Sequence, residues 1–391
     1  MEAFYKTHNY LVNDLKSPVR RLLMDEIDWS HRLIGIKGTR GVGKTTFLLQ
    51  YAKERFLNNK ECLYINFNNF YFTKHSLVDF AERFVKNGGK TLLVDQTFKY
   101  GNWSKELREC YDRFPSLHIV FSGSTVMRLI EDNDDLKDVV ASYNLRGFSL
   151  REFINLHSNN SFKHYSIEEI INNHEKIATE ICSKVNPFDY FKDYLHHGFY
   201  PFYLENRNYS ENLLKTMNML LEVDILLIKQ IDLKYLAKIR RLLYLLMLES
   251  PTTLNVSQLS LEIETSRATV MNYVKYLKDA RLLNMLYAEG EEFPKKPRHI
   301  YVQNTNLMHV VNAGAVDKLS ELKTFFYNTI HSRHKVNICR NNNDFCIDAK
   351  YNFRIENKAL SRYSTKAIYA VDGILKGHKN EIPIWLFGFL Y

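Results

Sequence analysis

One stretch of the chain has residue types and a spacing that could bind phosphate. Residues 38–45 read Gly-Thr-Arg-Gly-Val-Gly-Lys-Thr and match every fixed position of the pattern G-x-x-x-x-G-K-T. Glycines let such a loop curl so that successive N–H groups point at one anion, and the following helix adds the positive end of its dipole. We expect Lys44 to reach the β- and γ-phosphates of a nucleoside triphosphate and the Thr45 hydroxyl to ligate Mg²⁺. The expected nucleotide-binding residues are Gly38, Arg40, Gly41, Val42, Gly43, Lys44, Thr45 and Thr46.

Asp95 ends the apolar run 91–95, and Gln96 follows it. We interpret Asp95 as the Walker B aspartate, because a carboxylate at the end of a buried strand can hold the water shell of Mg²⁺ opposite Thr45. Nucleoside-triphosphatases of this layout usually have a glutamate at the next position, where it polarises the attacking water, and glutamine cannot accept a proton. General-base assistance contributes roughly 10²- to 10⁴-fold, so hydrolysis is expected to be slow. Either the protein is a natural nucleotide-dependent switch, or Gln96 is a deliberate replacement that traps the ATP-bound state.

Ser122 ends the apolar run 117–122, and Ser124 lies two residues beyond it. Both are placed where a polar side chain could sense the γ-phosphate or the attacking water. The alternative is a turn that supplies the N-cap of a helix starting at Thr125. The candidate catalytic residues are Lys44, Asp95, Gln96 and Ser122.

The elements that must position these residues alternate between strand-like and helix-like segments. Apolar runs at 32–36, 62–67, 91–95 and 117–122 suit buried strands, and residues 45–56 suit a helix. Strands that alternate with helices imply a parallel sheet covered on both faces. We therefore expect an α/β fold, with residues 1–155 forming a P-loop ATPase core.

Residues 156–235 are expected to form a helical lid or linker. Polar, loop-like patches at 158–161 and 172–173 precede a helix that starts at Phe188 and ends near Gly198. The segment Gly198-Phe199-Tyr200-Pro201 is similar to the Gly-x-x-Pro element with which some switch ATPases bring a lid helix over the nucleotide. The alternative is an ordinary corner between two helices.

Residues 236–310 have the pattern of a winged helix. A helix with one apolar face starts at Ala237, a helix-turn-helix spans 256–277 with Ser266 as an N-cap, and two apolar runs then suit a hairpin. Such a fold places its second helix in the major groove of DNA and its wing against phosphates. It also serves for contacts between proteins or within one chain. The candidate DNA contacts are Arg267, Thr269, Asn272, Lys275, Lys295, Lys296 and Arg298.

Residues 311–391 end in a basic segment that contains an acid followed by a Glu-x-Lys group. Asp344 precedes one strand-like run, and Glu356 and Lys358 lie at the end of the next. This is the arrangement of restriction-endonuclease-like folds, in whose active members the acids hold Mg²⁺ and the lysine stabilises charge on the attacked phosphate. The alternative is a degenerate domain that is structural or contacts DNA. We expect this small α/β, nuclease-like tail to pack against the winged helix.

Composition predicts a globular protein of two or three domains. The chain has 391 residues, a formal net charge of +9 and five cysteines without a C-x-x-C pair, which argues against a zinc site or a disulfide framework. It contains neither an uninterrupted apolar run of about 18 residues nor a signal-peptide core, so we expect a cytoplasmic protein with no membrane partner. The basic excess permits DNA as a partner.

Together these motifs resemble the bacterial and archaeal AAA-type ATPases, P-loop proteins of AAA+ or STAND-like type with a C-terminal winged helix and a restriction-endonuclease-like domain of unknown function. The resemblance rests on residues 38–46, 92–96, 99–107, 120–124 and 145–153, and it extends to the end of the chain. It implies ATP and Mg²⁺ as ligands, and we also expect a homo-oligomer.

The chain departs from the family pattern at two places. Gln96 stands where the family has glutamate, and Lys137-Asp138 stands where it often has a basic pair. An arginine finger is therefore not identifiable, and Lys137 and Arg146 are the remaining candidates.

The leading hypothesis is an AAA-type ATPase or nucleotide-dependent switch that converts ATP and water slowly to ADP and phosphate. Its nucleotide state would control the winged-helix and nuclease-like module. One alternative is a Mg²⁺-dependent nuclease that ATP regulates, acting through Asp344, Glu356 and Lys358. Another is a non-enzymatic DNA-binding or scaffold protein.

Overall fold

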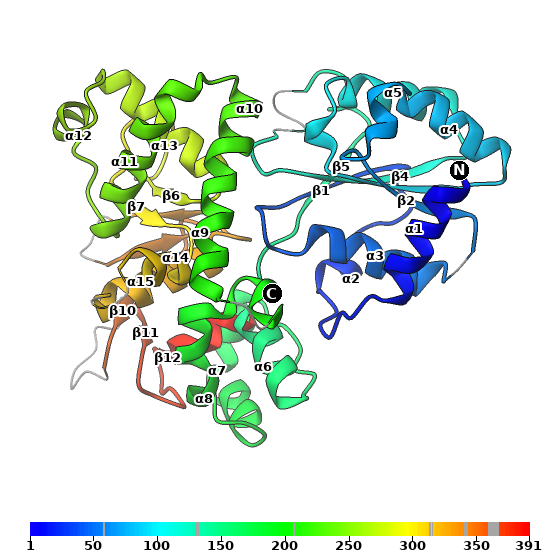
Figure 1. Cartoon of the computed structure of the whole chain (residues 1–391). Helices are drawn as coiled ribbons and strands as arrows, with labels where there is room; N and C mark the ends of the chain where they lie inside the picture. Colours follow the sequence, from blue (N-terminus) through cyan, green and yellow to red (C-terminus); the bar gives the residue numbers. More distant parts are fainter. Residues whose placement is uncertain are drawn as a thin grey trace. The chain divides into compact units, whose positions relative to one another are not determined.

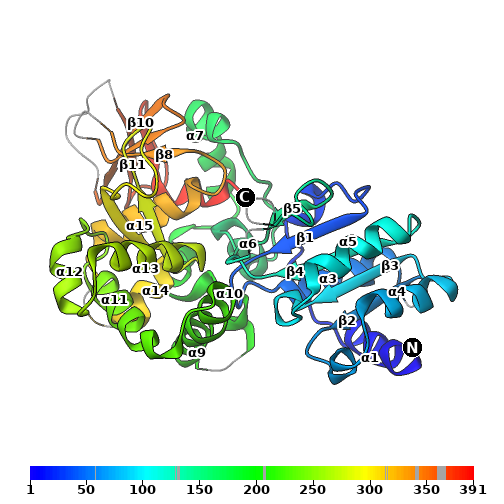
Figure 2. The same cartoon turned by 90° about the horizontal axis from the view of Figure 1, so that it is seen from above.

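The computed structural model describes residues 1–57, 59–127, 129, 133–205, 208–312, 314, 316–339, 343–358 and 367–391. The chain divides into two compact units, Met1–Gly147 and Phe148–Tyr391. Each unit contains a five-stranded sheet of its own (Figure 1, Figure 2).

The sheet of the first unit has the strand order β2-β3-β4-β1-β5, and all its neighbouring strands are parallel. Its strands are β1 (Leu33–Lys37), β2 (Cys62–Asn66), β3 (Thr91–Asp95), β4 (His118–Gly123) and β5 (Ala141–Asn144). All four apolar runs predicted as strands form strands, because near-continuous burial suits a parallel sheet with both faces covered. The α/β prediction is therefore confirmed.

Helices cover both faces of this sheet. They are α1 (Glu2–Asn13), α2 (Leu23–Glu26), α3 (Lys44–Arg55), α4 (Leu77–Lys86) and α5 (Trp103–Arg113), with the 3-10 helices η1 (Phe70–Thr73) and η2 (Thr97–Lys99). Figure 1 shows α4 and α5 on one face and α1 and α3 on the other. Strand β2 is at the edge of the sheet, where His8 of α1 accepts a hydrogen bond from the backbone N–H of Tyr64 at 3.0 Å. Covering an edge strand in this way satisfies a donor that would otherwise lack a ladder partner.

The second unit is mostly helical in its first part. Its α-helices are α6 (Leu150–Ser158), α7 (Ile167–Cys182), α8 (Phe188–Asp193), α9 (Tyr209–Met219), α10 (Leu226–Lys229), α11 (Leu236–Leu248), α12 (Val256–Glu262), α13 (Arg267–Asp279), α14 (Thr305–Val311) and α15 (Lys318–Ile330). This unit also contains the π-helices η3 (Tyr194–Gly198) and η5 (Leu220–Ile225). Its 3-10 helices are η4 (Pro201–Glu205), η6 (Leu233–Tyr235) and η7 (Ile384–Phe389).

One prediction for this region is wrong, since the polar pair at 172–173 lies inside α7 and not in a loop. A capping box formed by Ser166 and Glu169 starts the helix, and Ile170, Ile177 and other buried residues continue its apolar face. These signals outweigh the polar pair, whose effect is local: Asn173 has a non-helical φ of −130° and kinks the helix.

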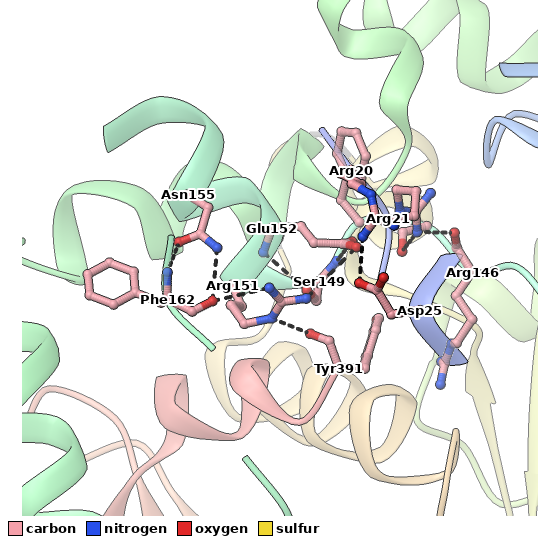
Figure 3. A network of polar contacts seen from close by, with 12 residues as sticks. Arg20, Arg21, Asp25, Arg146, Ser149, Arg151, Glu152, Asn155, Phe162 and Tyr391 are labelled. Carbon is pink, nitrogen blue, oxygen red and sulfur yellow. Dashed lines mark hydrogen bonds and ion pairs between the residues drawn. The ribbon is translucent and has the colours of Figure 1, made fainter. Parts of the chain in front are cut away.

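Helix α6 is tied to the last residues of the chain. It starts with a second capping box, in which Ser149 and Glu152 each accept a backbone N–H. The guanidinium of Arg151 donates to the carbonyl oxygens of Tyr391 at 3.0 Å and Phe162 at 3.2 Å (Figure 3). Residues far apart in sequence thus share one buried arginine.

Helices α11, α12 and α13 precede the antiparallel hairpin of β6 (Leu283–Leu286) and β7 (His299–Val302). The predicted N-cap is confirmed, because the Ser266 side chain accepts a hydrogen bond from the N–H of Thr269. Val270, Val274 and Leu277 on α13 are buried, as their helical spacing predicts.

The second sheet has the order β12-β11-β10-β9-β8. Its strands are β8 (Val336–Asn337), β9 (Phe345–Ile347), β10 (Tyr351–Glu356), β11 (Ile368–Val371) and β12 (Glu381–Pro383). Neighbouring strands among β8, β9 and β10 are antiparallel, whereas neighbouring strands among β10, β11 and β12 are parallel. Phe326 of α15 packs against Phe345 and Phe353 on this sheet.

The tail contacts the hairpin, as predicted. The N–H of Ile338 donates to the carbonyl of Tyr287 at 2.9 Å, and the Tyr327 hydroxyl donates to the carbonyl of Met285 at the same distance. Among the residues with a described structure, no helix combines the length and apolarity needed to cross a membrane.

Candidate nucleotide site

The loop between β1 and α3 has the backbone that its glycines predict. Gly41 and Gly43 have φ values of 82° and 92°, a region that side chains disfavour. At Gly38 a Cβ atom would lie 2.7 Å from the carbonyl oxygen of Leu145, so the chain passes too close for any larger residue. Gly43 is also the N-cap of α3 and cannot supply a capping side chain, which leaves the positive end of the helix open to an anion.

Lys44 is held at the loop by backbone carbonyls. Its ammonium donates to the carbonyl oxygens of Gly38 at 2.7 Å and Thr39 at 2.9 Å. The positive charge therefore lies against the loop that would surround a phosphate.

The remaining loop residues differ in what they contact. Val42 is buried, Thr46 is exposed, and the guanidinium of Arg40 lies 5.4 Å from the ring centroid of Phe98. The carbonyl of Val42 accepts a hydrogen bond at 3.1 Å from Arg21, a buried residue that the sequence motifs did not single out.

Arg21 also reaches the segment that follows β5. It donates to the carbonyl oxygens of Arg146 at 2.7 Å and Gly147 at 2.9 Å, and Figure 3 shows it beside the first of these. One side chain therefore joins the phosphate-binding loop to the last residues of the first unit.

Thr45 and Asp95 meet, as expected for a magnesium site. The Thr45 hydroxyl donates to Oδ2 of Asp95 at 2.6 Å, and Asp95 is 0% exposed at the carboxyl end of β3. Tyr64 donates to the same oxygen at 2.8 Å. Sequence analysis did not identify Tyr64, since a tyrosine within an apolar run reads as a core residue.

Ser122 is a strand residue and not part of a turn. It is buried in β4 and donates to Oδ1 of Asp95. Ser124 is in a turn, where it accepts a weak hydrogen bond from the N–H of Val126 at 3.4 Å. The predicted helix does not start at Thr125, because residues 125–126 form a turn; residues 128 and 130–132 lie outside the described part of the chain.

Gln96 directly follows β3 with a φ of 61°. Its N–H lies 3.0 Å from both Oδ1 of Asp95 and Oγ of Ser122. Its side-chain Oε1 is buried and has no hydrogen-bond partner among the described residues. Glutamine is thus next to the carboxylate, in a backbone conformation that is uncommon for a residue with a side chain.

The two candidates for an arginine finger both lie in the first unit. Lys137 forms an exposed ion pair with Asp134 at 2.6 Å. The carbonyl of Arg146 accepts the hydrogen bond from Arg21.

In the second unit, the candidate DNA contacts lie on α13 and on the connection between β6 and β7. Arg267 and Asn272 are exposed on α13, and the Lys275 ammonium lies 4.6 Å from the ring centroid of Phe293. Thr269 is half-buried beside the N-cap. Lys295, Lys296 and Arg298 are exposed in or after the connection, where Glu291 is 3.9 Å from Lys295 and 3.5 Å from Arg298.

Asp344, Glu356 and Lys358 lie at or near β10, where Oδ2 of Asp344 accepts a hydrogen bond from the N–H of Ile355 at 2.8 Å. Asp344 pairs with Lys323 of α15 at 2.7 Å, whereas Glu356 pairs with Arg354 at 2.6 Å and Lys358 is exposed beyond β10. Within the described ranges, no group of three His, Cys, Asp or Glu side chains is placed to hold a metal ion.

The Gly198–Pro201 segment packs inside the second unit. A Cβ atom at Gly198 would lie 2.6 Å from the ring of Tyr194, so glycine is needed for close packing. Asn306, which is 0% exposed, accepts hydrogen bonds from the Phe199 N–H and the Tyr209 hydroxyl and donates to the carbonyl of Leu195. This element is therefore anchored to α14.

Two family models match the sequence. Residues 30–154 match a family described as an AAA domain, and residues 188–316 match a family described as a domain of unknown function (DUF8612). The first match spans the loop, Asp95, Gln96 and Ser122.

An uncharacterized protein of Methanocaldococcus jannaschii is 27% identical over 274 residues, which are 66% of this chain and 57% of that protein. The chain thus spans little more than half the length of this curated relative.

Solved structures with some similarity include AMPPCP-bound DnaA from Aquifex aeolicus, at 14% identity and a TM-score of 0.25, covering 71% of this chain and 87% of that one. The Aeropyrum pernix ORC1 protein in complex with DNA has 10% identity and a TM-score of 0.30, covering 80% and 92%. On the family match, residues 30–154 carry an AAA-type P-loop ATPase domain.

Proposed function

We propose that the chain binds ATP with Mg²⁺ at the loop of its first unit and hydrolyses it slowly, acting as a nucleotide-dependent switch. One observation carries the proposal: the Thr45 hydroxyl lies 2.6 Å from the buried Asp95 carboxylate, directly after a loop with the backbone of a phosphate site. Hydroxyl and carboxylate oxygens are hard donors of the kind that Mg²⁺ prefers. The residues therefore fit a metal-bound triphosphate.

The residues of the site would have separate roles. The loop N–H groups and Lys44 would bind the phosphates, while Thr45 and Asp95 would hold Mg²⁺, which when bound neutralises charge on the transferred phosphoryl group. Ser122 holds Asp95 by a hydrogen bond. The amide of Gln96 could orient a water molecule but could not take its proton, and this is why slow turnover is proposed.

Calorimetric titration with ATP and Mg²⁺ tests the proposal. Lys44→Ala should abolish measurable binding, because it removes the cation that the loop holds. Lys53→Ala is the matched control, since Lys53 lies on the same helix and donates to the carbonyl of Leu15 at 3.1 Å. Absence of ATP affinity in the unmodified chain, or equal affinity after Lys44→Ala, would remove this proposal.

We further propose that the second unit is the module under control, with residues 236–310 as a winged helix and 311–391 as a nuclease-like domain. The exposed cations on α13 and on the β6–β7 connection support DNA as its partner. Fluorescence anisotropy with duplex DNA, with and without ATP, tests this role. The expected homo-oligomer is tested in the same samples by light scattering.

Cleavage of DNA receives less support than binding. Asp344 and Glu356 each pair with a separate cation, and among the described residues no group of three His, Cys, Asp or Glu side chains is placed to hold a metal ion. Incubation of plasmid DNA with the chain and Mg²⁺ separates the two activities: cleavage that is lost in Glu356→Ala would favour a nuclease.

A further inference from the structure

Tyr64 is a buried residue of β2 whose hydroxyl reaches across to the neighbouring strand. Its side chain is 4% exposed and donates a hydrogen bond to Oδ2 of Asp95 at 2.8 Å. In the register of the two parallel strands, Tyr64 is opposite Leu93 and Asn66 is opposite Asp95. The contact is therefore diagonal, a distance that an aromatic side chain can span and a short polar one cannot.

The carboxylate that Tyr64 contacts is hydrogen-bonded on every side. Oδ2 accepts from Thr45 at 2.6 Å and from Tyr64, and Oδ1 accepts from the N–H of Gln96 at 3.0 Å and from the hydroxyl of Ser122. Three of these donors come from different elements, α3, β2 and β4, and the fourth is the residue that follows Asp95. The orientation of the carboxylate is consequently set by its four partners.

Tyr64 is itself held in place at both ends. Its backbone N–H donates to Nδ1 of His8 at 3.0 Å, and Asn66 donates to its hydroxyl oxygen at 3.3 Å. A tyrosine hydroxyl is protonated at neutral pH, so Tyr64 is the donor in its hydrogen bond to Asp95. A donor fixed in this way can orient the group that it contacts.

We propose that Tyr64 is a positioning residue for the magnesium site, which it serves by holding Oδ2 of Asp95 beside the Thr45 hydroxyl. The proposal rests on the proposed function, because it assigns Tyr64 to the metal of a bound Mg²⁺–nucleotide. Residues that orient a metal-holding side chain typically change metal affinity 10- to 100-fold when they are replaced. A hydroxyl with a purely structural role would change folding stability without changing the Mg²⁺ requirement.

Tyr64→Phe in the full chain tests the proposal, because it removes the hydroxyl and keeps the ring. Binding of a fluorescent ATP analogue is measured as Mg²⁺ is added, with the metal-free affinity measured in EDTA. The half-saturating Mg²⁺ concentration should rise about 10-fold or more, while the metal-free affinity should stay unchanged. Tyr5→Phe is the matched control, since the Tyr5 hydroxyl donates to the backbone carbonyl of Lys60 at 2.8 Å and should leave both values unchanged.

A double-mutant cycle with Asp95→Asn shows whether Tyr64 acts through Asp95. In that background Tyr64→Phe should cause no further rise in the Mg²⁺ requirement. An unchanged or lower requirement in Tyr64→Phe alone overturns the inference, as does an equal rise in both backgrounds. If the unmodified chain binds no Mg²⁺–nucleotide, the proposed function fails first; if it binds and Tyr64→Phe binds equally, only the role of Tyr64 is wrong.

Discussion

Replacing Gln96 with glutamate should convert a slow site into a faster ATPase. The two side chains have nearly the same shape, so the backbone at φ 61° and the hydrogen bond from its N–H to Asp95 are expected to persist. The new carboxylate would stand at the position whose Oε1 is now buried without a hydrogen-bond partner among the described residues. Burial and the adjacent Asp95 should both raise its pKa toward neutrality, where a general base works best.

The size of the gain follows from the chemistry that the substitution restores. General-base assistance of roughly 10²- to 10⁴-fold corresponds to about 2.7 to 5.4 kcal/mol of barrier height. The same environment has a cost, because a carboxyl group whose pKa is raised on folding lowers the free energy of unfolding at pH 7. We therefore expect faster turnover together with a lower unfolding midpoint, which bound ATP should partly restore.

Steady-state phosphate release at saturating ATP and Mg²⁺ is the assay. Gln50→Glu is the matched control, because Gln50 is also a buried glutamine but lies farther along α3 from the loop. It should lower stability without raising turnover. If Gln96→Glu binds ATP normally and its turnover stays within about threefold of the unmodified chain, Gln96 does not occupy the position of a catalytic base.

Three further predictions concern other parts of the chain. Burial lowers the pKa of His8, whose Nδ1 accepts a hydrogen bond from the N–H of Tyr64, so below about pH 6.5 the folded state binds fewer protons than the unfolded state. The free energy of unfolding should therefore fall as the pH drops from about 6.5 to the pKa of His8 in the folded state. Denaturant titrations should show a smaller fall in His8→Gln. Asn306→Ala should lower the unfolding free energy by at least about 3 kcal/mol in chemical denaturation, since several buried groups lose their partner; a loss below 1 kcal/mol would mean that water replaces the amide. Arg267→Ala and Lys275→Ala should each weaken DNA binding. If the replaced residue contacts a phosphate, the magnitude of the slope of log affinity against log salt concentration should fall by about 0.9. An unchanged slope would mean that DNA does not contact that residue.

The parts of the first unit that could be predicted are those with a local cause. The bounds of β3 equal the predicted run 91–95, because a buried parallel strand reads as continuous apolar residues ended by a polar one. Gly41 and Gly43 have the positive φ values that the loop pattern requires. Thr45 and Asp95 meet because one lies in the first turn of α3 and the other ends β3 at the same edge of the sheet.

The error in the second unit arises where one local signal outweighs another. The asparagine pair at 172–173 resembles a loop, yet the capping box of Ser166 and Glu169 and the buried apolar residues keep the pair inside α7, with a kink at Asn173. Ser122 lies in β4, as its place in the run 117–122 predicts, but the Asp95 carboxylate that accepts its hydrogen bond is on another strand and cannot be identified from nearby residues.

Strand order explains why the partners of Asp95 could be found only in part. Parallel strands gather their carboxyl ends at one edge of a sheet, so any partner of the Asp95 carboxylate that is itself in a strand must come from the two strands beside β3. The order β2-β3-β4 makes those partners Tyr64 and Ser122. Knowledge of the strand order alone would therefore have limited the candidate partners of Asp95 in the sheet to the ends of two strands. Side-chain length would then have chosen between Tyr64 and Asn66. Asn66 is opposite Asp95 in the register, but the longer side chain of Tyr64, two positions earlier, reaches the carboxylate.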